Sequence, residues 1–397
     1  MKVMISAGEA SGDIHAAKLV EALHENATDA SSAVPALECF GMGGSQLAAH
    51  GVEILVDVDK NAVMGLLEVL HKYPALRANL NVLRTALTQR DPDILVLVDY
   101  PHFNMKLAAL AREKGIPVLF FIAPKVWASR PGRVNELKKL VDHMALILPF
   151  EKKIFDDAEV PNTYVGNPLL DNKPLVKASE KAPVAKGSSK RVALLPGSRQ
   201  SEISMLLPPM LETCDSLTES EDSIEFVLPV ADTINKQEIA NAVEECSSKV
   251  TLLKPTDYES LRSCDAALVA SGTATLELAI LGIPMVVIYK LNSISYSVLK
   301  RMLTTEHVSL VNIISGSEVV PEILQDDVTA VNLSREIQTL LTDNDAREKQ
   351  MAGLASVYKK LGKDGASKLT AELIVSLARK TTQVPVHAKN TRNSREP

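Results

Sequence analysis

The chain of 397 residues is predicted to form two α/β domains of the Rossmann type, closed by helices near its C-terminal end. Three observations predict this fold. Short, continuously apolar segments alternate with longer segments of helical periodicity, which is the pattern of parallel sheets covered on both faces. A loop of small residues follows the first apolar segment of each half. Between the halves lies a stretch rich in Pro, Ala, Ser and Lys without apolar periodicity, which is typical of a linker.

These patterns set the expected domain boundaries. Residues 1–171 are predicted to form the first domain, residues 172–190 the linker, and residues 191–380 the second domain with the closing helices. The polar tail of residues 381–397 has no apolar periodicity, so we expect it to be disordered.

Composition narrows the class of protein. A net charge of −6 and a pI near 5.8 argue against a general nucleic-acid binder. The four cysteines have neither disulfide nor metal spacing and are expected to be reduced, buried thiols. The chain begins directly with a strand-like segment, and no window of eighteen residues is apolar throughout. We therefore expect a cytoplasmic protein that at most lies on a membrane surface.

In the first half, each apolar segment predicts a buried strand. The strand of residues 3–6 leads into the loop GEASGD and then a helix over residues 14–25. This loop lacks the full G-x-G-x-x-G spacing, and no acidic residue follows the next strand to bind an adenosine ribose, so a dinucleotide is not favoured. The other strands of this half are expected at residues 37–41, 93–98, 118–122 and 143–148, with helices reaching residue 141 and starting after residue 150.

Residues 62–89 are predicted to be helical in two pieces, divided at Tyr73-Pro74. The first piece is apolar on nearly all sides. This pattern fits a buried helix, and it also fits a surface for lipid, flanked by Lys72, Arg77 and Arg84. Both interpretations remain open from the residues alone.

Asp99 follows the strand of residues 93–98 directly. Doubly wound sheets bind ligands outside the carboxyl ends of their strands, so Asp99 is a candidate general base. It could equally cap a helix that starts near Phe103. Two Asp-x-Asp pairs elsewhere lack further ligands nearby, and no metal site is predicted.

The second half repeats the architecture. A strand over residues 192–195 leads into the loop Pro196-Gly197-Ser198-Arg199 and a helix to residue 217. Small residues at a helix N-terminus beside a guanidinium form a plausible diphosphate clamp. The alternative is a solvated turn with a surface arginine. Strands are expected at residues 224–228 and 250–253, a helix at residues 294–303, an apolar segment at residues 308–312, and three helical stretches over residues 328–379.

Residues 266–289 predict a strand, a tight loop at Ser271-Gly272-Thr273, a helix, a turn and a second strand. Free N–H groups in this loop would form an anion site at the helix N-terminus. Glu277, about one turn into the helix, could accept both hydroxyls of a ribose. An ordinary crossover, with Thr273 capping the helix, is the alternative.

Eight motifs, in this order, strongly resemble the lipid-A-disaccharide synthase family. The resemblance extends over most of the chain. The motifs are GEASGD (8–13), AVMGLLEVL (62–70), VDYPHFN (98–104), PKVWA (124–128), LPFEK (148–152), LLPGSR (194–199), ASGTATLE (270–277) and VSLVNI (308–313).

The resemblance implies a GT-B-type glycosyltransferase, whose two Rossmann-like domains face a cleft. It implies an inverting, metal-independent transfer without a cofactor. The donor would be UDP-2,3-diacylglucosamine and the acceptor the 6-hydroxyl of 2,3-diacylglucosamine 1-phosphate (lipid X). The products would be the β-1,6 disaccharide precursor of lipid A and UDP.

By the matching motif, Asp99 is the implied catalytic carboxylate. His102, three residues further on, could orient that carboxylate or act as the base itself. The residues implied for the donor UDP are Gly197, Ser198, Arg199, Ser271, Gly272, Thr273, Glu277 and Asn312. Those implied for the acceptor and its acyl chains are Glu9, Ser11, Gly12, Asp13, Met64, Gly65, Leu66 and Leu67.

The resemblance also implies a peripheral protein on the cytoplasmic face of the inner membrane of a Gram-negative bacterium, as a monomer or homodimer, without nucleic acid. His102, Ser129 and Asn167 depart from the family pattern. A UDP-sugar 2-epimerase of similar architecture is the alternative enzyme, although the apolar segment at residues 64–70 weighs against it. A non-catalytic lipid- or nucleotide-sugar-binding protein is the alternative outside enzymes.

Overall fold

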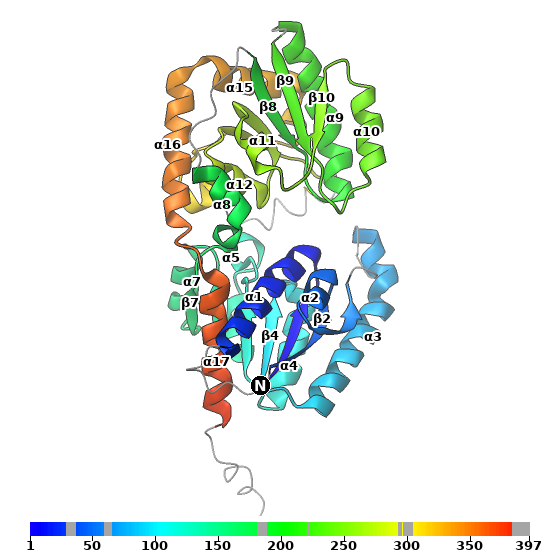
Figure 1. Cartoon of the computed structure of the whole chain (residues 1–397), viewed down its shortest axis with the longest axis vertical. Coiled ribbons are helices and arrows are strands. Elements are labelled where there is room, and N and C mark those ends of the chain that lie inside the picture. The colour runs from blue at the N-terminus through cyan, green and yellow to red at the C-terminus, as the bar shows by residue number, and fades with distance from the viewer. Residues whose placement is uncertain are drawn as a thin grey trace, which may run out of the picture. The chain divides into compact units, whose positions relative to one another are not determined.

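The computed structural model describes residues 1–28, 37–58, 66–180, 189–220, 223–292, 296 and 305–382, with the backbone alone for residues 27–28, 66–73, 220 and 379–382. It divides into two compact units, each built on one parallel sheet covered by helices (Figure 1). This confirms the predicted fold class. One unit consists of Met1–Val126, Pro131–Pro168 and Gly365–Pro397, and the other of Trp127–Arg130 and Leu169–Asp364.

The sheet of the first unit has seven parallel strands in the order β3-β2-β1-β4-β5-β6-β7. The order reverses between β1 and β4, which pair directly through Val3 and Ile94. Such a reversal is the switch point at which doubly wound sheets bind ligands. The strands are β1 Lys2–Ala7, β2 Glu38–Gly43, β3 Glu53–Asp57, β4 Ile94–Val98, β5 Val118–Phe121, β6 His143–Leu146 and β7 Asn162–Tyr164.

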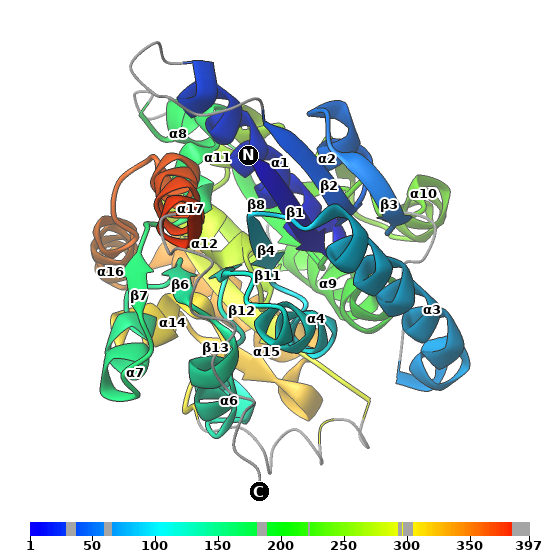
Figure 2. The same ribbon diagram turned by 90° about the horizontal axis from the view of Figure 1, so that it is seen from below.

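Helices cover both faces of this sheet because its strands are apolar on both sides. Val3 and Ile5 pack into a cluster with α1 (Ala10–Thr28) and α17 (Ala366–Thr382). Met4, between them, points to the other face and joins a cluster with residues of α3, α4 and α6. Figure 2 shows the two helix layers on either side of the strands. The remaining helices of this unit are α2 Ser45–Ala49, α3 Leu66–Arg90, α4 Pro101–Glu113, α6 Arg133–Leu140 and α7 Glu151–Asp157. Helix α5, Val126–Ser129, belongs to the second unit apart from its first residue.

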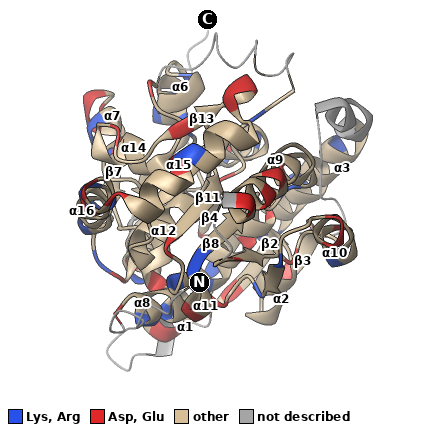
Figure 3. Cartoon of the chain, turned by 90° about the horizontal axis from the view of Figure 1, so that it is seen from above, with Lys and Arg blue, Asp and Glu red and all other residues tan. Residues whose placement is uncertain are grey.

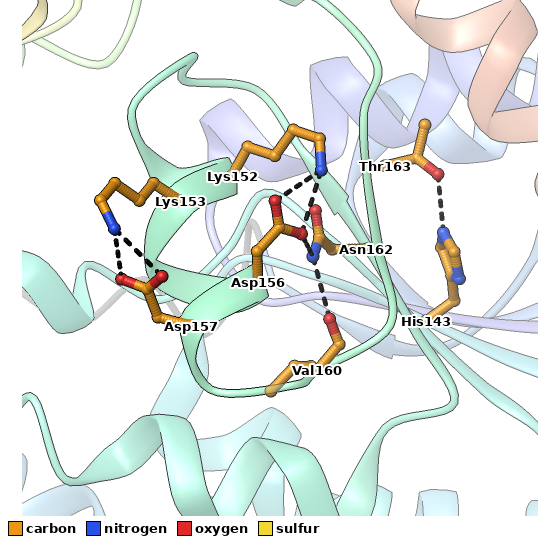
Figure 4. Close-up of polar contacts among 8 residues, drawn as sticks. All are labelled: His143, Lys152, Lys153, Asp156, Asp157, Val160, Asn162 and Thr163. Atoms are coloured by element: carbon orange, nitrogen blue, oxygen red, sulfur yellow. Dashed lines mark hydrogen bonds and ion pairs between the residues drawn. The ribbon is translucent and has the colours of Figure 1, made fainter.

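Polar side chains hold the β7 edge of this sheet (Figure 4). Asn162 Nδ2 of β7 donates to Asp156 Oδ1 of α7 at 2.9 Å, and Lys152 Nζ reaches Asp156 Oδ2 at 2.7 Å. The hydrogen bond from Lys152 is the largest cause of the lowered pKa of Asp156. One strand inward, His143 Nε2 lies 2.9 Å from Thr163 Oγ1. These exposed contacts contribute little stability each, so the apolar core carries the fold.

The sheet of the second unit has six parallel strands in the order β10-β9-β8-β11-β12-β13, and it reverses between β8 and β11. It therefore has the same kind of switch point as the first sheet. The strands are β8 Lys190–Leu195, β9 Ile224–Pro229, β10 Val250–Leu253, β11 Ala266–Ala270, β12 Met285–Tyr289 and β13 Glu322–Leu324.

One face of the second sheet packs on α9 (Gln200–Ser220), α10 (Lys236–Glu244) and α15 (Ala330–Thr342). On α12 (Ala274–Leu281) pack α8 (Lys173–Glu180) and α16 (Asn344–Lys360). Both signs of charge occur along outer helices such as α7 and α16 (Figure 3). The shorter elements are α11 Tyr258–Arg262, α14 Leu310–Ser315, and the 3-10 turns Pro168–Asp171 and Gln325–Asp327.

The domain boundaries differ from the predicted ones in two places. Residues 173–180, predicted as linker, form α8, which packs on α11 and α12 of the second unit. Helix α17 was predicted to close the second domain, but it packs on α1 of the first unit. Residues 181–188 of the predicted linker and residues 383–397 of the predicted disordered tail lie outside the described residues.

Two helices also differ from their predicted extent. Helix α1 starts at Ala10, so the last four residues of GEASGD form its first turn and are not a loop. Helix α3 runs through Pro74 without a break, although two pieces were predicted there. The predicted helix of residues 294–303 falls outside the described residues apart from Tyr296. Within the described chain, no helix is both long and apolar enough to cross a bilayer.

Candidate active site

Asp99 lies at the switch point of the first sheet, directly after β4. Its N–H donates to the carbonyl of Phe121 on β5 at 3.1 Å, and its carbonyl accepts from Asn104 Nδ2 at 2.7 Å. Asn104 is fully buried, and its Oδ1 also accepts from Ser6 Oγ of β1 at 2.6 Å. Three neighbouring strands therefore hold the backbone of Asp99. Helix α4 begins at Pro101, and Tyr100, not Asp99, occupies its N-cap position.

The backbone at this switch point is strained. Asp99 and Tyr100 have φ angles of 47° and 48°, and Ile122, which follows the adjacent strand β5, has a φ of 64°. L-residues rarely adopt this region, and a β-branched side chain such as that of Ile122 makes it costlier. Strain of this kind persists where surrounding structure imposes it, and it concentrates at functional sites. The three outliers thus support a functional role for this edge of the sheet.

The GEASGD segment meets Asp99-Tyr100 at the same edge. A Cβ on Gly8 would lie 2.0 Å from the Tyr100 ring, so only glycine allows this close packing. Burial raises the pKa of Tyr100, and the negative charge of Glu9 raises it further. Glu9 and Ser11 are exposed, whereas Gly12 is buried. The structure therefore brings the predicted acceptor segment beside the predicted base.

Asp13 was predicted to bind the acceptor, but its carboxylate is hydrogen-bonded within the protein. Its buried carboxylate accepts hydrogen bonds from the N–H groups of Gly44 at 2.7 Å, Gln46 at 2.9 Å and Leu47 at 3.3 Å. These groups form the N-terminus of α2, where a carboxylate is favoured. Asp13 therefore connects α1 to the N-terminus of α2, and its carboxylate supports the edge of the sheet through these hydrogen bonds.

The predicted lipid-binding residues are only partly described. Met64 and Gly65 lie outside the described residues, and Leu66 and Leu67 open α3 with their backbone alone described. Further along α3, Arg77 and Arg84 are exposed, while residues between and after them pack on the sheet. From Pro74 on, α3 therefore has one face packed on the sheet and one face exposed.

In the second unit, the Gly197–Arg199 loop follows β8 at the switch point. Glu202 Oε2 accepts from the N–H groups of Ser198 at 3.0 Å and Arg199 at 3.2 Å, and Arg199 Nη1 lies 3.3 Å from Glu202 Oε1. Gly197, with a φ of 115°, leaves room for this carboxylate, since a Cβ there would lie 2.3 Å from it. The Glu202 carboxylate thus accepts hydrogen bonds from two of the backbone N–H groups that were predicted to bind the diphosphate. The sequence interpretation missed Glu202, although an acidic residue three positions after the N-cap is a capping signal.

The second loop at this switch point follows β11. The N–H of Ser271 was predicted to be free, but it donates to the carbonyl of Ile288 at 3.0 Å and so extends the pairing with β12. Ser271 Oγ donates to the carbonyl of Val308 at 2.7 Å. Thr273 occupies the N-cap position of α12 without a side-chain capping bond, so the capping alternative is not seen either. A Cβ on Gly272 would meet nothing within 4 Å, which leaves open space beside this loop.

Glu277 of α12 is partly buried. Burial raises its pKa, and a hydrogen bond with Tyr258 of α11 opposes that shift. Tyr258 Oη also accepts from Asn172 Nδ2 at 3.0 Å. The sequence interpretation missed both Tyr258 and Asn172, because no motif or spacing joins these three segments.

Asn312 is fully buried, and both the nitrogen and the oxygen of its side-chain amide are hydrogen-bonded within the protein. Its Nδ2 donates to the Val320 carbonyl at 2.9 Å and to Glu322 Oε1 at 2.8 Å, and its Oδ1 accepts from the N–H groups of Val319 at 2.7 Å and Val320 at 3.0 Å. Glu322 also accepts from the Ser309 N–H at 2.9 Å. The Asn312 side chain therefore shapes the segment that contacts Ser271. Across the part of the chain that the structure describes, no group of three or more His, Cys, Asp or Glu residues is placed to hold a metal ion.

The two parallel sheets and their switch points define an α/β architecture of the GT-B type. UDP-GlcNAc 2-epimerase from Neisseria meningitidis, solved bound to UDP-GlcNAc, superposes with a TM-score of 0.64 at 15% identity, over 95% of this chain and 100% of its own. The calicheamicin glycosyltransferase CalG4 gives a TM-score of 0.60 at 13% identity, over 97% and 99%. At these identities the likeness is one of fold alone.

Sequence comparison gives the family. The profile of the lipid-A-disaccharide synthetase family matches residues 3–375. Lipid-A-disaccharide synthase from Geobacter sulfurreducens is 40% identical over 380 residues, covering 95% of this chain and 97% of that protein. The enzyme of the same name from Myxococcus xanthus is 40% identical over 379 residues, with the same coverage. The chain belongs to the lipid-A-disaccharide synthetase family.

Proposed function

We propose that this protein is a lipid-A-disaccharide synthase that transfers 2,3-diacylglucosamine from its UDP derivative to the 6-hydroxyl of 2,3-diacylglucosamine 1-phosphate, with inversion and without a metal ion. The observation that carries this proposal is the family match over almost the whole chain. Asp99, Arg199 and Glu277 stand unchanged in the motifs that define the resemblance. The products are the β-1,6 disaccharide 1-phosphate and UDP.

Asp99 is the proposed general base. In an inverting displacement, the acceptor oxygen attacks the anomeric carbon as the bond to the diphosphate breaks. The proton of the 6-hydroxyl passes to the Asp99 carboxylate and then to solvent. Its position after β4, tied by backbone hydrogen bonds to β5 and Asn104, suits a group that must be held in one orientation.

The residues of the second unit are proposed to bind the UDP part of the donor. Arg199 is proposed to exchange its ion pair with Glu202 for the diphosphate, whose charge grows as it departs. The amides beside Gly272 and Thr273 add the field of the α12 N-terminus. Glu277 is proposed to accept the ribose hydroxyls. Ser271 and Asn312 act by shaping the loops, since their polar groups are already bonded within the protein.

The acceptor and its acyl chains are proposed to bind beside GEASGD and the start of α3. Acyl chains leave a bilayer only at a cost of about 0.8 kcal/mol per methylene, so the enzyme must come to them. We place it on the cytoplasmic face of the inner membrane, as a monomer or homodimer. The exposed Arg77 and Arg84 would meet anionic headgroups there.

Mass spectrometry of the products, after mixing the protein with both diacyl substrates, tests the proposal. The expected product is the disaccharide 1-phosphate together with UDP, and the proton coupling constant of the new anomeric centre should show the β configuration. Turnover should persist in EDTA. Conversion of UDP-GlcNAc to its 2-epimer, without disaccharide formation, would favour the epimerase alternative and refute the proposal.

A further inference from the structure

The carboxylate of Glu202 lies on the loop that is proposed to bind the diphosphate of the donor. Its Oε2 atom accepts hydrogen bonds from the backbone N–H groups of Ser198 at 3.0 Å and Arg199 at 3.2 Å. Its Oε1 atom lies 3.3 Å from Nη1 of the Arg199 side chain. One negatively charged side chain therefore engages two backbone amides and the guanidinium of the same loop.

These contacts are of the kind that a phosphate group makes with such a loop. Phosphate oxygens accept from backbone N–H groups where a loop enters a helix, and from the planar guanidinium of arginine. An ionised carboxylate also offers two acceptor oxygens, so it can engage the same donors. The loop therefore already holds an internal anion of the same sign of charge as the proposed ligand.

The backbone of the loop leaves room for this carboxylate. Gly197 has a φ of 115°, and a Cβ there would lie 2.3 Å from Glu202 Oε2 and 2.8 Å from Glu202 Cβ. A separate segment also holds the loop, since Thr233 Oγ1 donates to the carbonyl of Ser198 at 2.7 Å. Because of this second contact, the shape of the loop does not depend on Glu202 alone.

The Glu202 side chain can move off the loop without disturbing the core. It is 30% exposed, and its partner Arg199 is 65% exposed, so water can replace either side chain as a partner. The start of α9 is fixed independently by Ile203, which is buried and whose N–H donates to the Arg199 carbonyl at 3.0 Å. A rotation of one side chain therefore suffices to free the two amides.

We propose that Glu202 is a built-in competitor of the donor diphosphate, whose carboxylate must leave the loop before UDP binds there. The proposal rests on the proposed role of the Gly197–Arg199 loop and adds a residue that lowers nucleotide affinity. Each amide has one proton and cannot donate fully to two anions, and two anions side by side also repel each other. The returning carboxylate in turn favours release of UDP after the transfer.

Calorimetry with UDP on the full chain tests the proposal by the sign of the effect. Glu202→Ala should bind UDP about 3- to 30-fold more tightly than wild type, because one or two net hydrogen bonds no longer have to be broken. Glu202→Gln keeps an acceptor oxygen for the amides but loses the charge, so its gain should be smaller. If the alanine variant does not fold, the glutamine variant still gives the sign. Uridine, which has no phosphate, should bind wild type and variants equally, as measured by ligand-observed NMR.

Glu238→Gln is the matched control for the change in charge. Glu238 is an exposed residue of α10 that lies close to the start of α9, where its Oε1 accepts from Gln200 Nε2 at 2.5 Å. The substitution removes the same charge as Glu202→Gln without freeing the amides of Ser198 and Arg199. UDP affinity should stay within about twofold of wild type, because solvent screens an exposed charge. An equal gain in both glutamine variants would show a general electrostatic effect and overturn the proposal.

The remaining outcomes separate this proposal from the function on which it rests. If wild type binds UDP and Glu202→Ala binds it equally or more weakly, the carboxylate is only a helix cap and the competitor role is overturned. An equal gain for uridine and UDP would also overturn it, because the diphosphate would then not be involved. If wild type does not bind UDP, or if Arg199→Ala binds it as tightly as wild type, the diphosphate assignment fails first and this proposal fails with it.

Discussion

Asp99 shows how much of one side chain's function depends on its backbone. Its left-handed φ and that of Tyr100 turn the chain sharply out of β4. Asn104 holds the turn by accepting from Ser6 and donating to the Asp99 carbonyl. The cost of this conformation is offset by buried hydrogen bonds, which is the arrangement expected for a residue kept for its chemistry.

Substituting Asp99 by Asn tests its role as base, because the amide keeps the shape and removes the basicity. We expect turnover to fall by about 10²–10⁴, the usual contribution of a general base. UDP affinity and melting temperature should change little, since the substituted atoms lie outside the UDP site and outside the hydrogen bonds described above. Steady-state kinetics, calorimetry and thermal unfolding give the three values.

His102→Ala is the matched control for that experiment. His102 is exposed on the first turn of α4 and is the other candidate base. Turnover should stay within about threefold of wild type if Asp99 is the base. Near-normal turnover of Asp99→Asn together with collapse of His102→Ala would reverse the assignment.

At this scale, the sequence predicted the residues that lie in compact motifs and missed those that come from other segments. Asp99, Arg199 and Glu277 could be named because each follows a strand or opens a helix. Tyr258 and Glu202 could not, because their partners are fixed by side-chain packing and not by strand order. Ser271 follows β11 as predicted, but its N–H was wrongly predicted to be free. This N–H donates to the carbonyl of Ile288 and so extends the sheet.

Among the elements, the start of α9 combines a cap with a ligand loop. Glu202→Ala removes the acceptor of the Ser198 and Arg199 N–H groups, so it should lower the free energy of unfolding by about 0.5–2 kcal/mol, as loss of a helix cap does. Chemical denaturation measures this value. Glu212→Ala, on an exposed position of the same helix, should change it by less than about 0.5 kcal/mol. Equal stability of the two variants would mean that the cap contributes nothing.

Helix α3 carries the proposed membrane contact. The double variant Leu66→Ser, Leu67→Ser should bind anionic phospholipid vesicles less, because each substitution removes about 1.5–3 kcal/mol of apolar transfer energy. Co-sedimentation measures the bound fraction, and circular dichroism checks the fold. Lower vesicle binding with an intact fold supports the lipid surface. An unfolded double variant would instead show that these leucines belong to the core.

The inner strands were predicted because continuously apolar segments between turn residues leave few alternatives to buried parallel strands. The edge strands β3, β7 and β13 were not predicted. The assignment of helices to sheets also failed. Periodicity shows that a helix such as α17 has an apolar face, but it does not show which sheet that face covers. Helix α8 was missed because Lys and Ser flank its few apolar residues, and only its packing on α11 and α12 stabilises it.

At the scale of the whole molecule, the stability of the first unit and nucleotide binding by the second should be separable. Ile374 of α17 is fully buried against β1 and α1 of the first unit. Ile374→Ala should cost about 2–5 kcal/mol of unfolding free energy, as for other large-to-small core substitutions. UDP affinity at 25 °C should be unchanged, because the proposed UDP-binding residues belong to the second unit.

Thermal unfolding and calorimetry measure the two quantities on the same variant. Glu372→Ala, on the exposed side of α17, is the matched control and should alter neither. A parallel loss of stability and UDP affinity in Ile374→Ala would show that the two units are energetically coupled.

The path of the chain between the units has a consequence for biosynthesis. The apolar cluster on one face of the first sheet includes Ala371 and Ile374, which lie near the C-terminal end. As the chain leaves the ribosome, the part of this face that α17 covers stays exposed while all of Leu169–Asp364 is made. At a typical 5–20 residues per second, that interval is roughly 10–40 seconds. The second unit can therefore fold first, and during that time the exposed face of the N-terminal sheet is a natural substrate for chaperones.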